Sequence, residues 1–232
     1  MEAKDRIIVA LDVSTLAEVH VLVRELAPHV GPFKVGLQLL TAVGAPLVVR
    51  TIHDLGGKVF FDGKFDDIPN TVGAAVSEAA RLGVSMLTVH ASGSGKMLRA
   101  AVEAAKASPE LMVLAVTVLT SMDGNDLEKI GVRGTVEDSV VRLATIALAS
   151  GCQGIVTSAR EASTLRRELG DKFAIVTPGV RPAGGDVGDQ VRVVTPAEAI
   201  ASGASHIVVG RPITEAADPA AEARAILGQI SR

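Results

Sequence analysis

The chain has 232 residues and a formal net charge of −3; 48% of its residues are hydrophobic, whereas aromatic residues make up only 2% and Trp and Tyr are absent. Such a composition can bury a large aliphatic core, and the length suits one α/β barrel domain. It disfavours nucleic acid as a partner, because the chain is net negative and has few side chains on which bases could stack.

The first apolar run, residues 7–11, is too short for the core of a signal peptide and is followed by Asp12. No run reaches the roughly 18 apolar residues that a membrane span requires. We therefore expect a cytoplasmic protein without a membrane partner. The single cysteine, Cys152, cannot form an internal disulfide, and we expect it to serve as a small apolar residue at the opening of a strand.

Eight short runs rich in β-branched residues recur along the chain, separated by stretches rich in Ala, Leu and Glu. In chain order they are residues 7–12, 33–36, 58–64, 85–90, 112–117, 154–157, 174–177 and 206–210. Strands that alternate with helices are typical of a parallel sheet, and eight such units in about 230 residues match a closed barrel better than an open sheet. The sequence predicts a single (β/α)8 TIM barrel, with one catalytic domain over residues 1–232.

The helices between these runs carry boundary signals. Thr15 followed by Glu18 forms a capping-box pattern, and three prolines stand where a first helical turn can begin: Pro69, Pro196 and Pro212. Glycines fall where helices are expected to stop, because glycine accepts the left-handed conformation of a C-cap. These glycines are Gly56, Gly57, Gly83, Gly151, Gly170 and Gly203.

Two connections, residues 121–135 and 178–190, are longer and more polar than the others. Long loops in compact domains often act as functional lids. Both follow strands, so we expect both on the C-terminal face of the barrel, where barrel enzymes keep their active sites.

The third strand ends in the segment DGKFDDIPNT, residues 62–71. Residues two apart on a strand point to the same side, so Asp62 and Lys64 are expected to project together into the barrel mouth, with Asp67 at the start of the loop. Asp12 closes the first strand and Lys34 lies in the second. An ordinary ion pair beside a solvated helix entrance is the simpler interpretation, but four converging charges are costly to desolvate, and that cost points to function.

The segment DGKFDDIPNT closely resembles the DxKxxDIPxT motif of orotidine 5′-monophosphate decarboxylases. Other marks of that family follow in its order, and the resemblance covers Arg6 to Ile213. They are ALD at Asp12, FKVG at Lys34, LTS at Thr120, PGVRP at Arg181, Gln190, and VGRPI at Gly210 and Arg211. The resemblance implies a cofactor-free, metal-free enzyme that removes carbon dioxide from orotidine 5′-monophosphate and leaves uridine 5′-monophosphate.

The chemistry requires a cation beside carbon six of the orotate ring, and Lys64 is the candidate for this cation and for the proton donor. The resemblance places Asp62 close to the scissile carboxylate, although a milder role in orienting Lys64 and Lys34 stays open. It places Asp12 and Lys34 at the ribose hydroxyls. It also implies that Asp67 and Thr71 reach into the site of a neighbouring subunit, so that the active unit is a homodimer.

The phosphate of such a substrate lies far from the reacting carbon. Arg181, Gln190, Gly210 and Arg211 fit its binding, the last two because they lead from a strand into a helix whose N-terminus favours an anion. Thr120 is the candidate for a hydrogen bond to the pyrimidine, with Ser121 as its competitor.

Two positions depart from the family motif: Gly63 stands where Leu is usual, and Asp66 where His is common. Gly63 is expected to point away from the cavity and to affect packing behind the strand, whereas the accommodation of Asp66 is not evident from the sequence. His90 ends the fourth strand in TVHASGSG, and we expect it to face the same rim, chiefly in a structural hydrogen-bonding role.

Two other functions compete. A magnesium-dependent decarboxylase or aldolase of sugar phosphates shares the strand-three Asp and Lys, but such enzymes place a metal-binding Glu where this chain has Lys34, whose ammonium would repel a divalent cation. A non-catalytic nucleotide-binding barrel is the second rival, because fold alone does not establish catalysis.

Overall fold

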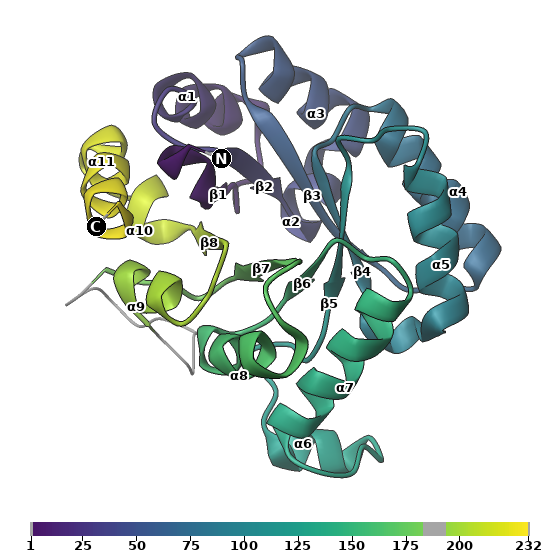
Figure 1. The fold of residues 1–232 in the computed structure, drawn as a ribbon. Coiled ribbons are helices and arrows are strands. Elements are labelled where there is room, and N and C mark those ends of the chain that lie inside the picture. Colours follow the sequence, from purple (N-terminus) through teal and green to yellow (C-terminus); the bar gives the residue numbers. More distant parts are fainter. Residues whose placement is uncertain (1, 183–193, 232) are drawn as a thin grey trace.

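The computed structural model describes residues 2–182 and 194–231. Eight parallel strands close into a barrel in the order in which they occur along the chain, and helices form a ring around it (Figure 1). The strands are β1 (Ile7–Ala10), β2 (Pro32–Val35), β3 (Lys58–Phe65), β4 (Met86–His90), β5 (Met112–Val116), β6 (Gly154–Val156), β7 (Ala174–Thr177) and β8 (His206–Val209). The predicted barrel is confirmed, and no described strand boundary differs from its prediction by more than two residues.

The α-helices of the outer ring are α1 (Leu16–Leu26), α2 (Leu37–Val43), α3 (Ala45–Asp54), α4 (Pro69–Arg81), α5 (Ser94–Ala105), α6 (Gly124–Lys129), α7 (Val136–Ala149), α8 (Ala159–Leu169), α9 (Pro196–Ala201), α10 (Arg211–Thr214) and α11 (Pro219–Ile230). Short 3-10 helices, η1 (Ala3–Arg6) and η2 (Ala91–Gly93), precede β1 and follow β4. The last helix, α11, contacts α1 and η1, so the two ends of the chain meet and complete the ring (Figure 1).

The local boundary signals are mostly confirmed. Thr15 Oγ1 accepts a hydrogen bond from the Glu18 backbone N–H, and the Glu18 carboxylate accepts one from the Thr15 N–H, which completes the predicted capping box. The expected helix-ending glycines have positive φ, except Gly57. A Cβ at Gly57 would lie 2.7 Å from Ile52 Cγ2, so close packing accounts for this glycine better than a left-handed turn. The predicted loop 121–135 contains a short helix, α6, that was not predicted from the sequence.

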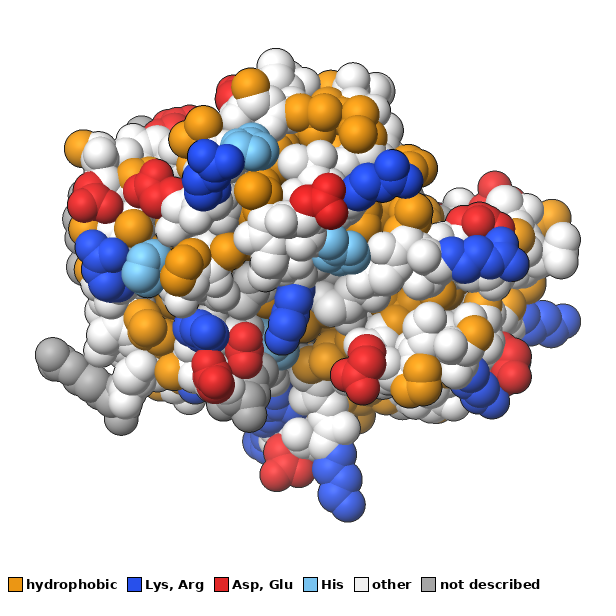
Figure 2. All heavy atoms as spheres, turned by 90° about the horizontal axis from the view of Figure 1, so that it is seen from above, with side chains coloured by type: hydrophobic (Ala, Val, Ile, Leu, Met, Phe, Trp, Pro, Cys, Tyr) orange, Lys and Arg blue, Asp and Glu red, His pale blue; other side chains and the backbone are white. Residues whose placement is uncertain are grey.

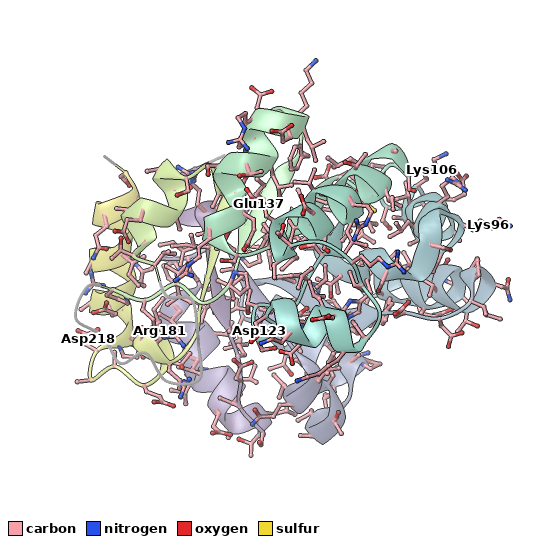
Figure 3. The ribbon with its side chains drawn as sticks, turned by 90° about the horizontal axis from the view of Figure 1, so that it is seen from below. Lys96, Lys106, Asp123, Glu137, Arg181 and Asp218 are labelled. Carbon is pink, nitrogen blue, oxygen red and sulfur yellow. The ribbon has the colours of Figure 1, made fainter. Side chains whose placement is uncertain are left out.

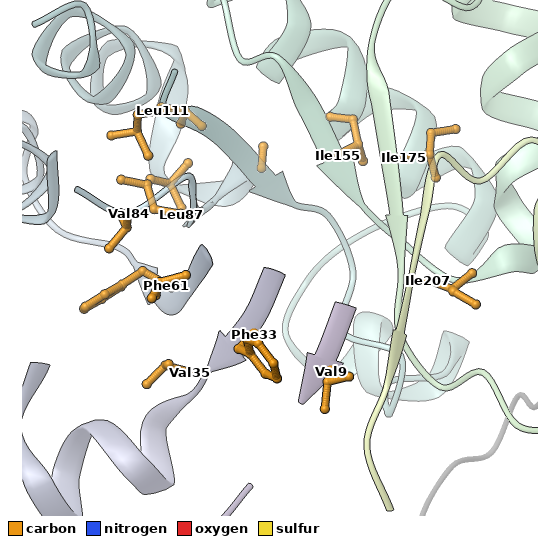
Figure 4. Packing of buried hydrophobic residues seen from close by; sticks show 14 of the residues in the cluster. Val9, Phe33, Val35, Phe61, Val84, Leu87, Leu111, Ile155, Ile175 and Ile207 are labelled. Carbon is orange, nitrogen blue, oxygen red and sulfur yellow. The ribbon is translucent and has the colours of Figure 1, made fainter. Parts of the chain in front are cut away.

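The hydrophobic core has two layers because successive side chains of each strand point to opposite faces. Val9, Phe33, Ile155 and other outward-facing residues pack beneath the helices (Figure 4). The inward-facing set fills the barrel interior: Ile8, Ala10, Phe60, Met86, Leu114, Val176 and Val208. This inner layer fills the barrel and forms the apolar floor of its C-terminal mouth, and polar side chains lie above it.

Arg166, on α8, ties the base of the barrel together. Its guanidinium donates to the carbonyls of Gly203 at 3.0 Å and Phe173 at 2.9 Å, and to Ser205 Oγ at 3.1 Å. It also lies 4.7 Å from the centroid of the Phe173 ring, within range of a cation–π contact. One side chain thereby joins α8 to the segments that enter β7 and β8.

Two buried titratable side chains lie apart from the mouth. Burial raises the pKa of the Cys152 thiol to about 12, in keeping with the predicted role of a small apolar residue. Burial, followed by the nearby Arg6 cation, lowers the pKa of His206 to about 4, and its Nδ1 has no hydrogen-bond partner in the described part of the chain. Both groups are therefore uncharged near neutral pH.

The surface in Figure 2 mixes Lys and Arg with Asp and Glu, without a continuous field of one sign on this face. Within residues 2–182 and 194–231, no helix is both long and apolar enough to cross a membrane.

Candidate active site

A cavity of about 830 Å³ opens at the carboxyl ends of the strands, directly above the apolar floor. Eight of the predicted site residues line it: Asp12, Lys34, Asp62, Lys64, Thr120, Arg181, Gly210 and Arg211. Thr120 lines the cavity, whereas its competitor Ser121 is not among the lining residues. The volume suits a ligand of nucleotide size.

A row of alternating charges lines this cavity above the apolar floor. Lys34 Nζ donates to Asp12 Oδ1 at 3.1 Å and lies 3.7 Å from Asp62 Oδ2, and Lys64 Nζ donates to that same Asp62 oxygen at 2.8 Å. The Asp62 side chain is 12% exposed and that of Lys34 is 14% exposed, whereas Asp12 is open to solvent. The row holds an ammonium at each side of one nearly buried carboxylate, as the sequence predicted.

Gly36, directly after β2, leaves space for the side chain of Lys34. A Cβ at Gly36 would be only 2.9 Å from Lys34 Nζ, although the backbone there (φ −102°, ψ −175°) is extended and open to any residue. The missing side chain at position 36 therefore makes room for the Lys34 ammonium between its two carboxylates.

The strand that carries Asp62 and Lys64 is not regular. Phe61 pairs with Leu87 and Phe65 with Val89, so four steps along β3 oppose two along β4. Within this irregularity Lys64 has φ +49°, in the left-handed region that residues with a Cβ rarely adopt. Simple alternation along the strand does not predict this conformation, and no local residue pattern signals it.

The two arginines differ in setting. Arg181 is buried, donates to the Val180 carbonyl at 3.0 Å and lines the cavity; Arg211 is exposed at its edge. Figure 3 labels Arg181 in the connection after β7 and Asp123, the N-cap of α6, in the connection after β5; both lie in the lower half of that view. The helix that Arg211 begins has four residues only, so its dipole is small and the Arg211 charge is the stronger attraction for an anion.

Among the described residues, two predicted ones do not line the cavity. Asp67 and Thr71 are exposed near the start of α4, and Asp67 Oδ1 accepts from the Ile68 backbone N–H at 2.6 Å. The adjoining Ile68 is 66% exposed. Gln190 lies outside the described residues.

Gln38 and Glu215 are among the lining residues that were not predicted. Gln38 Nε2 donates to Ser14 Oγ at 2.9 Å and thereby joins the start of α2 to the connection after β1. Each stands a few residues after a predicted site residue, Lys34 or Arg211, and this spacing after a strand end was the available signal.

The departures from the family motif have local explanations. A Cβ at Gly63 would lie 2.7 Å from Phe61 and 2.9 Å from Phe65, whose ring centroids are 5.6 Å apart, so the two rings fill the space where a side chain would be. Gly63 points away from the cavity, as expected. Asp66 Oδ1 is 2.6 Å from the Cβ position of Gly93 at the start of α5, where the helix dipole favours a carboxylate.

His90 is half-buried at the end of β4 and is not among the cavity-lining residues. Burial lowers its pKa, and Lys64 lowers it further, against the opposing effects of Asp66 and Asp62. The ring is therefore held neutral beside the charged row. Its structural hydrogen-bonding role stays a prediction.

The closed parallel barrel and the charged cavity at its carboxyl end define a barrel enzyme for a small anionic substrate. The model of the orotidine 5′-phosphate decarboxylase / HUMPS family matches residues 5–226. The chain belongs to this family.

Relatives match over nearly the whole chain. The orotidine 5′-phosphate decarboxylase of Moorella thermoacetica is 52% identical, and the match covers 99% of this chain and 94% of that protein. The enzyme of the same name from Marinomonas sp. is 48% identical over the full length of both. The crystal structure of orotidine 5′-phosphate decarboxylase from Lactobacillus acidophilus has a TM-score of 0.88 at 35% identity and covers 98% of this chain and 100% of that one.

Proposed function

We propose that this protein decarboxylates orotidine 5′-monophosphate to uridine 5′-monophosphate, the last step of de novo pyrimidine nucleotide synthesis. The observation that carries the proposal is a row of charged residues in the cavity, in a chain of this family: Asp12, Lys34, Asp62 and Lys64. In this proposal, residues 1–232 form one catalytic domain, and the protein is located in the cytoplasm.

Loss of carbon dioxide leaves an electron pair in the plane of the ring, where the ring π system does not delocalise it. Lys64 supplies a cation beside carbon six as the carbon–carbon bond breaks, and its ammonium then donates a proton to that carbon. The bond electrons stay on carbon six, carbon dioxide departs, and Lys64 regains a proton from solvent. The 2.8 Å contact with Asp62 holds the ammonium in place before substrate arrives.

Asp62 has two roles within this proposal. Its carboxylate, fixed between two ammonium groups, repels the substrate carboxylate, and this repulsion falls as charge moves into the ring. It also orients Lys64 and Lys34, which is the milder of the two roles. An Asp62→Asn variant separates them, because the amide oxygen can still accept the hydrogen bond from Lys64 but the side chain lacks the repelling charge.

The rest of the cavity accommodates the other parts of the nucleotide. Asp12 and Lys34 bind the ribose hydroxyls, and Thr120 donates to the pyrimidine. Arg181 and Arg211, with Gly210 and Gln190, bind the phosphate, and binding energy from this remote dianion orients the reacting ring. The support for this division is that both arginines line the same cavity as the lysine–aspartate row, with Arg181 buried and Arg211 exposed at the edge.

A homodimer with shared sites completes the proposal, with Asp67 and Thr71 acting in the partner's cavity. The support is that both residues are exposed and not among those lining their own cavity, while the adjoining Ile68 leaves an aliphatic side chain in solvent. Mixing inactive Lys64→Ala and inactive Asp67→Ala proteins under subunit exchange is expected to restore about a quarter of wild-type activity, because half the dimers are hybrids with one intact site each.

A matched control for this mixing uses Lys64→Ala with Asp62→Ala. These two residues contact each other within one chain, so every hybrid site keeps one defect and activity stays absent. Recovery with Asp67→Ala and none with Asp62→Ala supports the shared site. Equal absence of recovery in both mixtures refutes it.

The activity test is the change in ultraviolet absorbance of orotidine 5′-monophosphate with purified protein, with and without a chelator. Conversion that is insensitive to chelator is the expected result, because Lys34 and Lys64 supply the cations around Asp62. Inactivation by chelator and recovery with magnesium favours the sugar-phosphate rival. Absence of any conversion, even in a single turnover, favours a non-catalytic nucleotide-binding barrel.

A further inference from the structure

The end of β3 has an irregular backbone conformation that needs a stabilising contact. Lys64 has φ +49°, and a non-glycine residue in this region costs about 1 kcal/mol or more. The shifted pairing with β4 also interrupts the regular hydrogen-bond ladder at Asp62 and Lys64. A neighbouring group has to satisfy the displaced backbone if this conformation is to persist.

Thr88 provides that group. It lies on β4 in the barrel interior, two residues beyond the core residue Met86, and is 1% exposed. The Lys64 backbone N–H donates to Thr88 Oγ1 at 2.9 Å, and the Thr88 hydroxyl donates to Asp62 Oδ1 at 2.9 Å. A hydroxyl has one proton and two lone pairs, so it can serve both contacts at once.

These two bonds assign the oxygens of Asp62. Oδ1 accepts from Thr88, whereas Oδ2 faces Lys64 at 2.8 Å and Lys34 at 3.7 Å. Rotation of the carboxylate would break the Thr88 bond inside a buried setting, where an unmade hydrogen bond is expensive. Thr88 thus controls both the backbone that carries Lys64 and the rotation of the carboxylate that meets its ammonium.

We propose that Thr88 is a positioning residue for the decarboxylation, which keeps Lys64 and Asp62 in their reactive arrangement before substrate binds. The inference rests on the proposed function. Thr88 touches the two charged residues and is not among the residues that line the cavity, so its effect passes through them. Substitution of Thr88 is therefore expected to lower kcat and to leave KM nearly unchanged.

The test is a series at position 88. Thr88→Val keeps the shape and removes both hydrogen bonds, Thr88→Cys keeps a weak donor, and Thr88→Ser keeps the hydroxyl. We expect kcat to fall roughly 10- to 100-fold for Val, less for Cys and within about threefold for Ser, with KM nearly constant. The expected order of kcat values follows the hydrogen-bonding strength of the side chain and not its volume. The Ser and Cys variants still test the proposal if the Val variant does not fold.

Thr177→Val is the matched control. Thr177 is a fully buried threonine on β7, and its Oγ1 has no hydrogen-bond partner within the described residues. We expect wild-type kcat for this variant. An equal loss of kcat at Thr88→Val and Thr177→Val would reduce the effect to core packing and overturn the proposal.

Two further outcomes also overturn it: wild-type kcat in Thr88→Val, or a Ser variant as slow as the Val variant. A crystal structure of Thr88→Val in which Lys64 keeps its positive φ and its contact with Asp62 does so as well. Failure of the proposed function is distinguishable, because in that case the wild-type protein itself does not convert orotidine 5′-monophosphate.

Discussion

Replacing Gly36 with Ala tests the arrangement of the charged row without changing a charged residue. The added methyl would lie 2.9 Å from Lys34 Nζ, and a relaxed non-bonded contact needs roughly 3.5 Å, so the ammonium retreats by about 0.6 Å. The backbone at position 36 suits alanine, and Lys34 is a flexible side chain, so we expect the free energy of unfolding to fall only by the amount that these ion pairs weaken.

The magnitude follows from the two distances in the row. With an effective dielectric constant of about 20, a retreat of about 0.6 Å from carboxylates at 3.1 and 3.7 Å weakens the attraction by roughly 1.5 kcal/mol in total. Asp12 is 58% exposed, and solvent screening reduces this to about 1 kcal/mol. We therefore expect kcat/KM for orotidine 5′-monophosphate to fall about fivefold.

The assay compares Gly36→Ala with Gly228→Ala, a helical glycine in α11 whose Cβ position has no described atom within 4 Å apart from its own helix backbone and chain neighbours. Gly228→Ala is expected to keep wild-type kcat/KM. In a Lys34→Met background, Gly36→Ala is expected to cause no further loss, because the ammonium it displaces is gone. A full fivefold loss in that background would refute the reasoning, as would wild-type kcat/KM in the single Gly36→Ala variant.

Three other predictions concern the phosphate, the barrel base and pH. Arg211→Ala is expected to lower kcat/KM about 10- to 150-fold for orotidine 5′-monophosphate, but to match wild type on a substrate without phosphate. An equal loss on both substrates would show that Arg211 does not bind the phosphate. Arg166→Met loses the hydrogen bonds of its guanidinium at the base, roughly 2–4 kcal/mol, and its Tm is expected to fall by about 10 °C. The exposed neighbour Arg167→Met is expected to keep a Tm near wild type, and equal Tm values for the two variants would contradict this. The folded-state pKa of His206, about 4, lies below the unfolded value near 6.5. The contribution of neutral His206 to stability is therefore complete above pH 6.5 and is lost as the pH falls toward 4. The free energy of unfolding lost in this way is at most roughly 3 kcal/mol. In urea unfolding, His206→Leu is expected to flatten this acid dependence, and an unchanged pH profile would show that His206 does not cause it.

Much of the barrel was predictable because its signals are local. Runs of β-branched residues placed the strands to within two residues, and the capping box at Thr15 placed the start of α1. The four charges of the row were also predictable, since each stands at or near the end of a strand and parallel strand ends converge. Their meeting in one cavity confirms that placement.

The contacts between strands were not predictable from the same signals. The pairing shift at β3, the positive φ of Lys64 and the two hydrogen bonds of Thr88 depend on how one strand lies against the next. A threonine in a strand is ordinary, and its sequence neighbours do not indicate which backbone its hydroxyl meets. The dependence of Lys34 on an empty position at Gly36 is hidden for the same reason.

Gly63 bears on how the motif can change during evolution. The rings of Phe61 and Phe65 occupy the volume that a side chain at position 63 would need, at 2.7 and 2.9 Å from the missing Cβ. Exchange of this glycine for leucine alone creates an overlap, and loss of a ring alone leaves a void. The three positions must therefore vary together, so a leucine tolerated here in a relative would be harmful in this background until one of the phenylalanines had changed first.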